Sequence, residues 1–463
     1  MELLYKVKDR PSPGKLAMFA FQQLLSILAG TITLPLIVGN GMSQSAALLG
    51  ACLGTLVYLL ITKFKSPVFL GSSFTYLGSM SAAFAGAATA AMGYLGLLIG
   101  AILAGLVYVT LSIIVHFTGS KWVDKLMPPV IIGPVVAIIA LILAPNAIKN
   151  ITLGNVYDKA GVSVANPYLC LFCGLVALIA AVVCAVYGKK TLKLIPFIIG
   201  MLTGYGVALI FTLIGNATNT PALQIISFEP FKNMKWIPDL TFLKAIEGAQ
   251  NFKNSQEFWR YFSLITVSYV PVAFVVFAEH IADHKNISYI IETDLLRDPG
   301  LSRTLMGDGV GSIVGATFGG CPNTTYGESI SCLAFSKNAS IITIITTACL
   351  GVLVSFFGPV MTFFSTIPNC VVGGISICLY GFIAISGFQM LKKVDLSQQK
   401  NIFVIATIFV LGIGGLVIQF KYFEFSPVAT ALIAGILMNL LVNIKPRKHR
   451  EIEEKDENKT GNQ

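Results

Sequence analysis

The sequence predicts an all-α polytopic membrane protein, and three observations carry this prediction. Hydrophobic residues make up 55% of the 463 residues, whereas Asp, Glu, Lys and Arg together make up 12%, about half their share in soluble domains. The mean hydropathy of +0.78 is too high for one soluble core to hide. The apolar residues also fall in long runs, which excludes a disordered protein, a disulfide-stabilised secreted domain and an ordinary soluble enzyme.

Fourteen apolar runs can be counted, and most are long enough to span a bilayer. The first seven lie at 16–38, 44–62, 67–84, 86–117, 128–145, 167–187 and 194–215. The other seven lie at 257–282, 304–319, 322–336, 339–366, 370–391, 401–419 and 426–444. The third and tenth runs are short and are interrupted by Gly, Pro, Ser and Thr, so neither is expected to form an unbroken spanning helix.

Basic residues predict how these segments are oriented. With a cytoplasmic N-terminus and fourteen crossings, 24 of the 32 Lys and Arg residues lie on the inner side, as the positive-inside rule requires. The net charge of +10 is therefore attributed to cytoplasmic loops and not to nucleic-acid binding. This pattern predicts a multi-pass protein of the plasma (inner) membrane with both termini in the cytoplasm.

The longest polar interval divides the chain into two halves. The predicted parts are a cytoplasmic N-terminus (1–15), a seven-span repeat (16–215), an extracytoplasmic connection (216–256), a second seven-span repeat (257–444) and a cytoplasmic tail (445–463). Because seven is odd, the second repeat would be inverted relative to the first, as in many transporters. An echo supports the repeat: SPVFLGSSFTYLGSM in the third run and GGCPNTTYGESI in the tenth both place Pro before small, hydroxyl and aromatic residues.

Ionisable residues are rare within the runs, and such residues usually face a cavity because a charge in the membrane is costly. The eighth run ends in FAEHIADH, which puts Glu279 and Asp283 on one helix face and His280 and His284 on the next. We expect His284 near the membrane interface. The broken tenth run carries Glu328. Broken backbone at membrane depth lies inside the protein or beside a water-filled cavity, so Glu328 indicates a binding site.

Other polar residues leave alternatives open. Asp308, at the start of the ninth run, is either a helix cap or a site residue. Gln22 and Gln23 in the first run either line the site or hold helices together. Cys170 and Cys173 form a CxxC within an apolar run and are interpreted as core residues. No metal site is expected, because the eighth run lacks the HExxH arrangement.

The residues of the broken runs suit a planar ligand with alternating N–H and C=O groups. Carboxylates accept hydrogen bonds from N–H groups, and helix N-termini direct amides at carbonyl oxygens. Phe74 and Tyr76 offer ring faces for stacking. A cyclic imide satisfies all three. An inorganic anion would require Lys or Arg deep within the runs, and a metal cation would leave the aromatic residues without a role.

The same segments resemble the signatures of the nucleobase–ascorbate transporter family, also called nucleobase:cation symporter-2, and most of all its bacterial uracil permeases. They are FAEHIADH (Phe277–His284), GGCPNTTYGESI (Gly319–Ile330), FLGSSFTYLGS (Phe69–Ser79), VVGGISICLYGFIAISG (Val371–Gly387) and DLLRDPGLSRTL (Asp294–Leu305). The resemblance covers nearly the whole chain. It implies fourteen spans in a seven-plus-seven inverted repeat, with spans 1–4 and 8–11 as core domain and spans 5–7 and 12–14 as gate domain. It also implies a short strand and a half-helix in spans three and ten.

The resemblance further implies the substrate-binding residues. In the uracil branch, the pyrimidine is held by glutamates at the positions of Glu279 and Glu328. The aromatic ring at the position of Phe74 stacks near it, and backbone amides near Tyr326 and Gly327 contribute.

A proton-coupling group is implied as well, comprising Glu279, Asp283, Tyr380 and His280. Two departures from the family pattern concern this group. Some uracil permeases have His where this chain has Asp283, and the first span often has a Gln-His pair where this chain has Gln22–Gln23. We therefore expect the proton path to run through carboxylates in place of imidazoles.

The sequence thus predicts a proton-coupled uracil importer working by alternating access, with the proton as coupling ion, no cofactor and no enzymatic activity. The expected partners are uracil, protons and the lipid bilayer, with a homodimer implied by the relatives and no nucleic acid. One alternative is a purine symporter for xanthine or urate, but such relatives carry Gln-Asn where this chain has Glu328-Ser329. Another alternative is an anion exchanger of the same plan, which the acidic residues disfavour.

Overall fold

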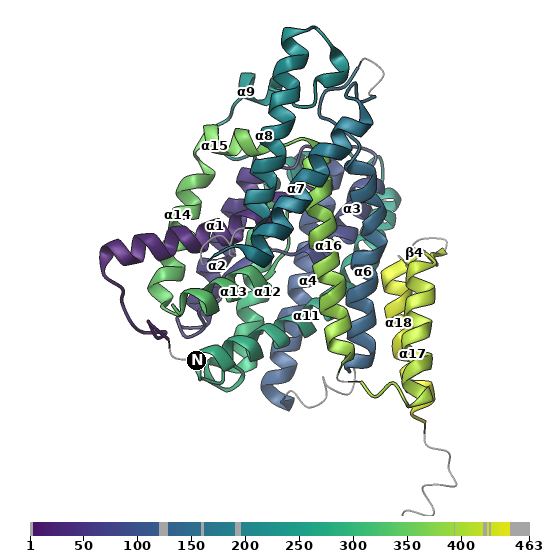
Figure 1. Ribbon diagram of the computed structural model, residues 1–463. Helices are drawn as coiled ribbons and strands as arrows, with labels where there is room; N and C mark the ends of the chain where they lie inside the picture. The colour runs from purple at the N-terminus through teal and green to yellow at the C-terminus, as the bar shows by residue number, and fades with distance from the viewer. Residues whose placement is uncertain are drawn as a thin grey trace, which may run out of the picture.

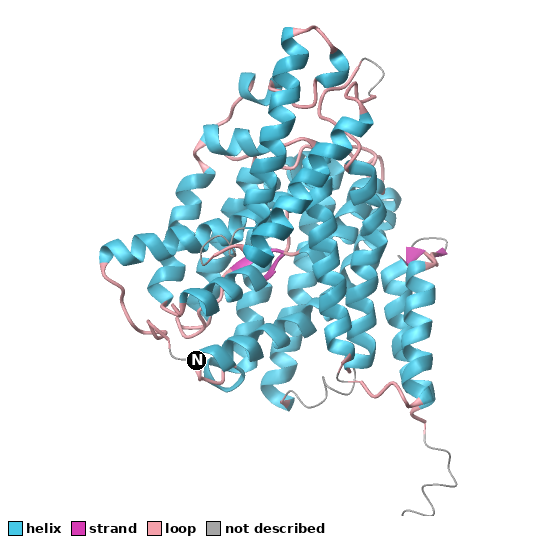
Figure 2. Cartoon of the chain, viewed as in Figure 1, coloured by secondary structure: helices cyan, strands magenta, loops and turns pink. Residues whose placement is uncertain are grey.

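The computed structural model describes residues 3–119, 128–158, 162–189, 196–392, 394–419, 424–425 and 427–444. These residues are almost wholly helical, and one short strand pair lies deep among the helices (Figure 2). The predicted tail at 445–463 lies outside the described residues.

Each predicted run of the first half is helical over most of its length except the broken third. The helices are α1 (Pro13–Val38), α2 (Gln44–Ile61), α3 (Leu77–Ala85), α4 (Ala90–Thr118), α6 (Pro129–Asn150), α7 (Pro167–Tyr187) and α8 (Pro196–Ala217) (Figure 1). In the third run, strand β1 (Leu70–Ser72) and the 3-10 turn η1 (Phe74–Tyr76) precede α3. The connection contains η3 (Pro221–Leu223), α9 (Glu229–Lys232) and α10 (Thr241–Ala249).

The second half repeats the combination of a strand followed by a short helix. Its elements are α11 (Ser255–Ile291), η4 (Leu296–Gly300), α12 (Leu301–Gly319), β2 (Asn323–Thr325), α13 (Gly327–Ser336), α14 (Ile341–Ser355), α15 (Gly358–Ser365), α16 (Asn369–Leu391), α17 (Gln399–Ile413), β3 (Ile418–Gln419), β4 (Glu424–Phe425) and α18 (Pro427–Val442). The eleventh run bends by 78° between α14 and α15. The thirteenth is shorter than predicted, because α17 ends at Ile413 before Gly414 and the positive-φ Gly415.

The described residues form a multi-pass membrane protein. Eight of the described helices are long and apolar enough to cross a membrane, or nine if the bent pair α14–α15 is one span. Large apolar side chains lie exposed on the helices; Phe117, Tyr187 and Leu353 are 81%, 78% and 70% exposed. Such surfaces suit contact with lipid, whereas soluble monomers rarely expose apolar patches of this extent.

Helices α2 and α12 cross at backbone contact because glycines face one another. A Cβ added at Gly54 would lie 2.5 Å from the carbonyl oxygen of Gly311, and one at Gly50 would collide with that of Gly315. Small residues at such spacing let membrane helices approach closely. Helix α12 also packs on α4, and α14 packs on both α1 and α2.

A second set of helices packs mainly within itself. Helix α16 lies against α6 and α7, α7 against α8, and α17 against both α6 and α18. Gly133 of α6 and Gly387 of α16 face each other, as do Gly174 of α7 and Gly374 of α16, so these helices approach closely. In Figure 1, α17 and α18 stand together at the edge of the molecule.

The broken third and tenth runs meet at the strand pair. Strands β1 and β2 are antiparallel, with Leu70 opposite Thr325 and Gly71 opposite Thr324. The Ser73 amide extends the pair by donating to the Pro322 carbonyl over 2.9 Å. All residues of both strands are buried. The predicted short strands are therefore present, and their pairing brings η1 and the start of α13 together from opposite halves of the chain.

The N-terminal segment is held against the connector between α13 and α14. The amides of Leu4 and Tyr5 donate to the Lys337 carbonyl over 2.8 and 3.2 Å, and the Ala339 amide donates to the Tyr5 carbonyl over 2.9 Å. These bonds tie the chain that enters α1 to the chain that leaves the broken tenth run.

Candidate functional site

Two carboxylates of α11 each reach a different broken run. Glu279 and Asp283 are partly buried and lie four residues apart on α11. The Thr75 hydroxyl of η1 donates to Glu279 Oε2 over 3.1 Å. The Thr325 hydroxyl, at the end of β2, donates to Asp283 Oδ2 over 2.5 Å. One face of α11 is thus joined to both halves of the strand pair.

Glu328 lies in the first turn of α13, and α1 holds this turn in place. The Ser26 hydroxyl donates to the backbone carbonyl of Glu328 over 3.1 Å. The buried Gln23 amide donates to the Ser329 hydroxyl over 2.5 Å. For Gln23, the structure therefore supports a role in holding helices together. Through Ser26 and Gln23, α1 therefore fixes the backbone of the turn that carries Glu328.

The start of α13 presents free space next to its first amides. A Cβ added at Gly327 would have no atom within 4 Å. The first N–H groups of a helix have no partner within it and carry partial positive charge. The backbone at Gly327 can therefore approach a carbonyl oxygen closely, as the resemblance implies.

The side chains of Phe74 and Tyr326 differ in how deeply they are buried. Phe74 on η1 is partly buried, whereas Tyr326 is 4% exposed. A Cβ added at Gly30 of α1 would collide with the Tyr326 hydroxyl, and one at Gly71 of β1 would collide with its ring. The Tyr326 side chain therefore fills a slot between α1 and β1, and only its backbone is placed to serve a ligand.

His280 pairs with Asp308 in the interior. His280 Nδ1 lies 2.6 Å from Asp308 Oδ2, and its Nε2 lies 3.1 Å from the Thr304 hydroxyl. Both partners are essentially unexposed. The interpretation of Asp308 as a helix cap is wrong, because α12 begins at Leu301 and Asp308 lies well inside it. Flanking glycines, Gly307 and Gly309, let α12 pack so closely that this Asp is enclosed.

His284 is also enclosed by protein, which the eighth run alone did not indicate. His284 is fully buried, and its ring stacks on His280 with centroids 4.0 Å apart. Its Nδ1 donates to the His280 carbonyl over 2.8 Å, since a carbonyl can only accept, and its Nε2 lies 2.8 Å from the Tyr58 hydroxyl. Helix α2, which supplies Tyr58, covers this end of α11.

Tyr380 lies apart from the α11 carboxylates. It is in α16, and its buried hydroxyl lies beside Ser376 of the same helix. Among the described residues, no hydrogen bond joins this hydroxyl to Glu279 or Asp283. The structure thus places Glu279 beside Thr75 of η1, Glu328 next to Gly327 in the first turn of α13, and Tyr380 on a different helix, α16.

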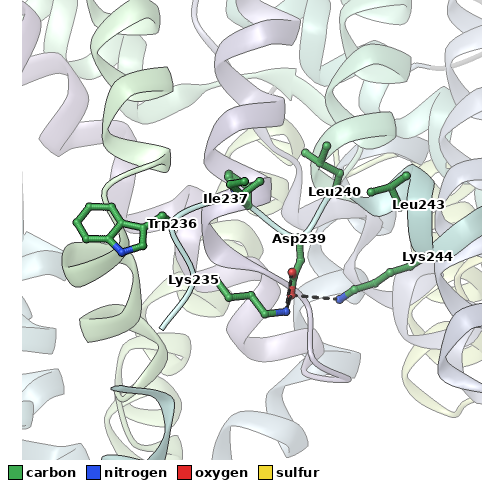
Figure 3. A pocket seen from close by; sticks show the side chains of 8 residues that line it. Lys235, Trp236, Ile237, Asp239, Leu240, Leu243 and Lys244 are labelled. Atoms are coloured by element: carbon green, nitrogen blue, oxygen red, sulfur yellow. Dashed lines mark hydrogen bonds and ion pairs between the residues drawn. The ribbon is translucent and has the colours of Figure 1, made fainter. Parts of the chain in front are cut away.

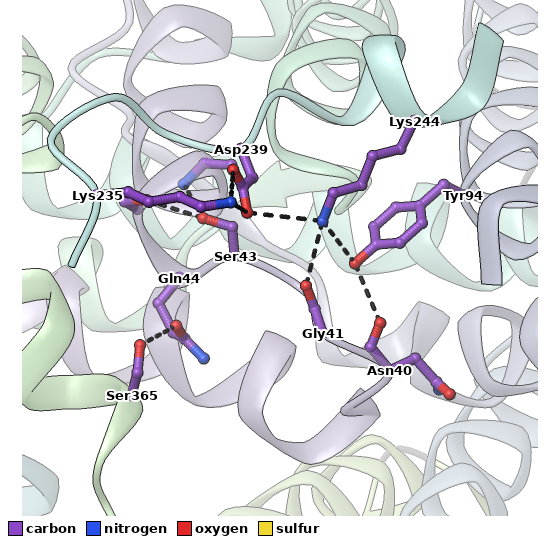
Figure 4. A network of polar contacts seen from close by, with 11 residues as sticks. Asn40, Gly41, Ser43, Gln44, Tyr94, Lys235, Asp239, Lys244 and Ser365 are labelled. Carbon is purple, nitrogen blue, oxygen red and sulfur yellow. Dashed lines mark hydrogen bonds and ion pairs between the residues drawn. The ribbon is translucent and has the colours of Figure 1, made fainter. Parts of the chain in front are cut away.

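A separate polar network lies on the 216–256 connection. The Lys244 ammonium donates to the Gly41 carbonyl over 3.3 Å, lies 4.4 Å from the Tyr94 ring centroid and lies 3.8 Å from Asp239 (Figure 4). Lys235 donates to the same Asp239 over 2.8 Å. Burial lowers the pKa of Lys244 below its ordinary value, although Asp239 opposes this shift.

Two cavities open around this network. One of about 540 Å³ is shown in Figure 3 and is lined by Lys235, Trp236, Ile237, Pro238, Asp239, Leu240, Leu243 and Lys244. Another, of about 320 Å³, lies between this segment, the start of α2 and α15. None of the predicted site residues lines either cavity.

Sequence reasoning missed three partners of the carboxyl-bearing segments: Thr75, Thr325 and Ser26. The available signal was the hydroxyl residues that both broken runs share. Which hydroxyl meets which carboxylate depends on strand register, and no local pattern in this sequence determines that register.

Relatives of the chain come mainly from one group of transporters. The chain is 35% identical over 457 residues to a uracil permease of Bacillus caldolyticus, covering 97% of each chain. It is 34% identical to the uracil permease of Bacillus subtilis strain 168, covering 94% of each. It is 29% identical to that of Escherichia coli strain K12, covering 95% of this chain and 94% of the other.

Solved structures with the same fold share little sequence with this chain. The transmembrane domain of a cyanobacterial bicarbonate transporter matches 94% of this chain and 99% of its own, with a TM-score of 0.59 and 14% identity. The murine Solute Carrier 26 family member A9 anion transporter in the inward-facing state matches 94% of this chain and 69% of its own, with a TM-score of 0.64 and 13% identity. These likenesses identify the fold as that of membrane transporters.

A sequence-family model described as a permease family matches residues 14–420, which include α1, both strands of the crossing pair and the carboxylates of α11 and α13. Together with the uracil permeases that match along nearly their whole length, this match shows that the chain belongs to the permease family of nucleobase:cation symporter-2 transporters.

Proposed function

We propose that this protein imports uracil together with protons by alternating access. The observation that supports the proposal is the pairing of β1 with β2, which brings together Thr75, the hydroxyl partner of Glu279, and the start of α13, which carries Glu328. Uracil permeases that match this chain at 34% and 35% identity point to the same substrate. The protein is accordingly a transporter and not an enzyme.

Both N–H groups and one carbonyl of uracil are assigned partners in this scheme. The carboxylates of Glu279 and Glu328 accept from the two ring N–H groups. The amides at the start of α13, at Gly327, donate to a ring carbonyl. Phe74 on η1 supplies a ring face for stacking. These residue types match a planar imide better than an inorganic anion, which would favour basic partners.

Proton coupling is assigned to Glu279 and Asp283, with His280 and Tyr380 as the further members of the proton-linked group. Removing a carboxyl from water disfavours its charged form, so the two α11 carboxyls can exchange protons during transport. We infer that a proton taken up from the outer side neutralises one of them when uracil binds. Its loss to the more alkaline cytoplasm then favours release. The proton is the only coupling ion in this scheme, and no cofactor takes part.

The fourteen-span, seven-plus-seven architecture is part of the proposal, and the packing supports it. The α4–α12 contact recurs as α14–α2, α7–α8 recurs as α17–α18, and α7–α16 recurs as α17–α6. The strand pair has a local two-fold axis through Gly71 and Thr324. Thr75 and Glu328 both lie four residues beyond that pair and are 253 residues apart; their contact partners, Glu279 and Ser26, are also 253 residues apart.

This repeat leads to the proposed domains and location. Spans 1–4 and 8–11 form the core domain around the strands, and spans 5–7 and 12–14 form the gate domain. The repeats occupy 16–215 and 257–444, joined by the extracytoplasmic connection 216–256. We place the protein in the inner membrane with both ends, 1–15 and 445–463, in the cytoplasm. A homodimer stays a prediction.

A purine symporter and an anion exchanger are the competing assignments. The bicarbonate transporter and the A9 anion transporter share the fold, which keeps the second class open. The carboxylates of Glu279, Asp283 and Glu328 at the crossing disfavour an anion. Xanthine and urate relatives carry Gln at the position of Glu328, so Glu328 disfavours the assignment as a purine symporter.

Competition uptake tests the substrate. Cells that lack their own uracil permease and express this chain should accumulate labelled uracil, and unlabelled uracil should block that uptake. Xanthine, uric acid and bicarbonate in equal excess should leave it unchanged, because Glu328 suits the pyrimidine imide. Equal inhibition by xanthine would assign a purine carrier. Bicarbonate exchange without uracil uptake would assign an anion exchanger.

A further inference from the structure

We propose that Thr75 and Thr325 are positioning residues that hold Glu279 and Asp283 in place through both the charged and the neutral stages of transport. This inference rests on the proposed proton-coupled uptake of uracil. It assigns a function to two hydroxyls that touch no substrate in the proposed binding scheme.

The Thr75–Glu279 and Thr325–Asp283 contacts share the same arrangement. Each Thr belongs to a broken run, Thr75 just after β1 and Thr325 at the end of β2. Each is largely buried, at 8% and 2% exposure. Each donates across elements to a carboxylate of α11, over 3.1 Å to Glu279 and 2.5 Å to Asp283. Two hydroxyls from opposite halves of the chain thus fix two carboxylates on one helix face.

These hydroxyls differ from most threonine hydroxyls of this fold. Thr346 in α14 and Thr407 in α17 donate to carbonyls of their own helices, at Ile342 and Phe403, which is the local way to satisfy a buried hydroxyl. Neither Thr75 nor Thr325 bonds its own segment in this way. Their hydroxyls donate instead to Glu279 and Asp283, the ionisable groups of the proposed transport cycle.

A hydroxyl suits a carboxyl that must gain and lose a proton. It has one donor hydrogen and two acceptor lone pairs, so it donates to a carboxylate and accepts from a carboxylic acid. A backbone N–H or a Lys can only donate, so neither could accept a hydrogen bond from the O–H of a protonated carboxyl. When a proton from the outer side forms the new O–H bond on Asp283, the Thr325 hydroxyl can turn and keep the contact. When that proton leaves to the cytoplasm, the Thr325 hydroxyl turns back and again donates to the Asp283 carboxylate.

The position of the Asp283 carboxylate matters because other acidic groups surround it. Asp283 interacts with Glu279 on its own helix, with Asp308 on α12 and with Glu328 on α13. His280 and His284 lie on the adjacent face of α11, where His280 pairs with Asp308. A small rotation of the Asp283 carboxylate changes its distance to the other acidic groups, so the proton-binding behaviour of the set depends on the hydroxyl that holds it.

The test replaces each hydroxyl with an isosteric methyl. Thr75→Val and Thr325→Val are compared with Thr75→Ser and Thr325→Ser, which keep the hydroxyl, and with Thr346→Val, which loses a hydroxyl bonded within its own helix. Purified variants in proteoliposomes are assayed for uracil KM and for the pH dependence of uptake. Thermal unfolding of each variant confirms folding, and Thr325→Ala replaces Thr325→Val where the second methyl impairs it.

We expect Thr75→Val to raise KM about tenfold, because the variant loses one hydrogen bond to a charged group. Thr325→Val should move the pH profile of uptake with little change in KM at the optimum. The Ser variants and Thr346→Val should match the unaltered protein. Unchanged KM and pH profile in folded Val variants would overturn the inference, as would Ser variants that are impaired like the Val ones. Failure of the unaltered protein to take up uracil would instead overturn the proposed function.

Discussion

Glu328→Gln should abolish measurable uracil uptake, and Glu279→Gln should do the same or leave uptake that no longer responds to a proton gradient. Each change keeps the volume, replaces one carboxylate oxygen with an NH2 group and removes the charge that, in the proposed binding scheme, accepts from a ring N–H. Losing a charge-assisted hydrogen bond, together with leaving a buried donor on the ligand unpaired, costs about 3 kcal/mol, or roughly a hundredfold in affinity. Equilibrium binding of labelled uracil to the purified variants measures this loss.

The matched control is Glu229→Gln, which alters an exposed glutamate paired with Lys232 in the connection. It should bind and transport uracil normally. A Glu279→Gln protein that transports uracil at the normal rate and stays coupled to protons would show that the central carboxylate is assigned wrongly.

Gly50→Ala should strongly destabilise the protein, because the added Cβ meets the backbone of α12. The closest atom to that Cβ would be the Gly315 carbonyl oxygen, which cannot move without displacing the helix. Overpacking at such contacts costs about 1–3 kcal/mol. It outweighs the roughly 1 kcal/mol that Ala contributes over Gly in a helix. Thermal unfolding in detergent should therefore show a clearly lower midpoint.

Gly206→Ala in α8 is the control for that change, since a Cβ there would have no atom within 4 Å. It gains helix propensity without a clash and should unfold at an equal or higher temperature. If Gly50→Ala and Gly206→Ala unfolded at the same temperature, the close crossing of α2 and α12 would not be a determinant of stability.

The sequence was most informative where its signal was local. Pro, Gly and hydroxyl residues interrupt the third and tenth runs, and the structure has β1 and β2 at these places. The spacing of Glu279 and Asp283 placed them on one helix face. A strand pair needs partners far apart in the chain, so neither the antiparallel register nor the bonds from Thr75 and Thr325 could be predicted from either run alone.

Errors arose where distant packing overrode a local pattern. His284 lies at the polar end of an apolar run, and the run alone does not reveal that α2 covers it through Tyr58. Asp308 stands next to glycine, which is typical of a cap, yet the glycines serve close packing and Asp308 meets His280 in the interior. The thirteenth run ended early because two glycines, Gly414 and Gly415, outweigh the hydrophobicity around them.

The central claim is that this protein couples uracil entry to proton entry through the carboxyl groups at the strand crossing. The most direct measurement is uptake of labelled uracil by proteoliposomes containing the purified protein, with an acidic exterior and an alkaline lumen. Uracil should accumulate above its external concentration, and a protonophore should reduce it to equilibration. Accumulation that persists with the protonophore, or depends on sodium in place of the pH gradient, would contradict the claim.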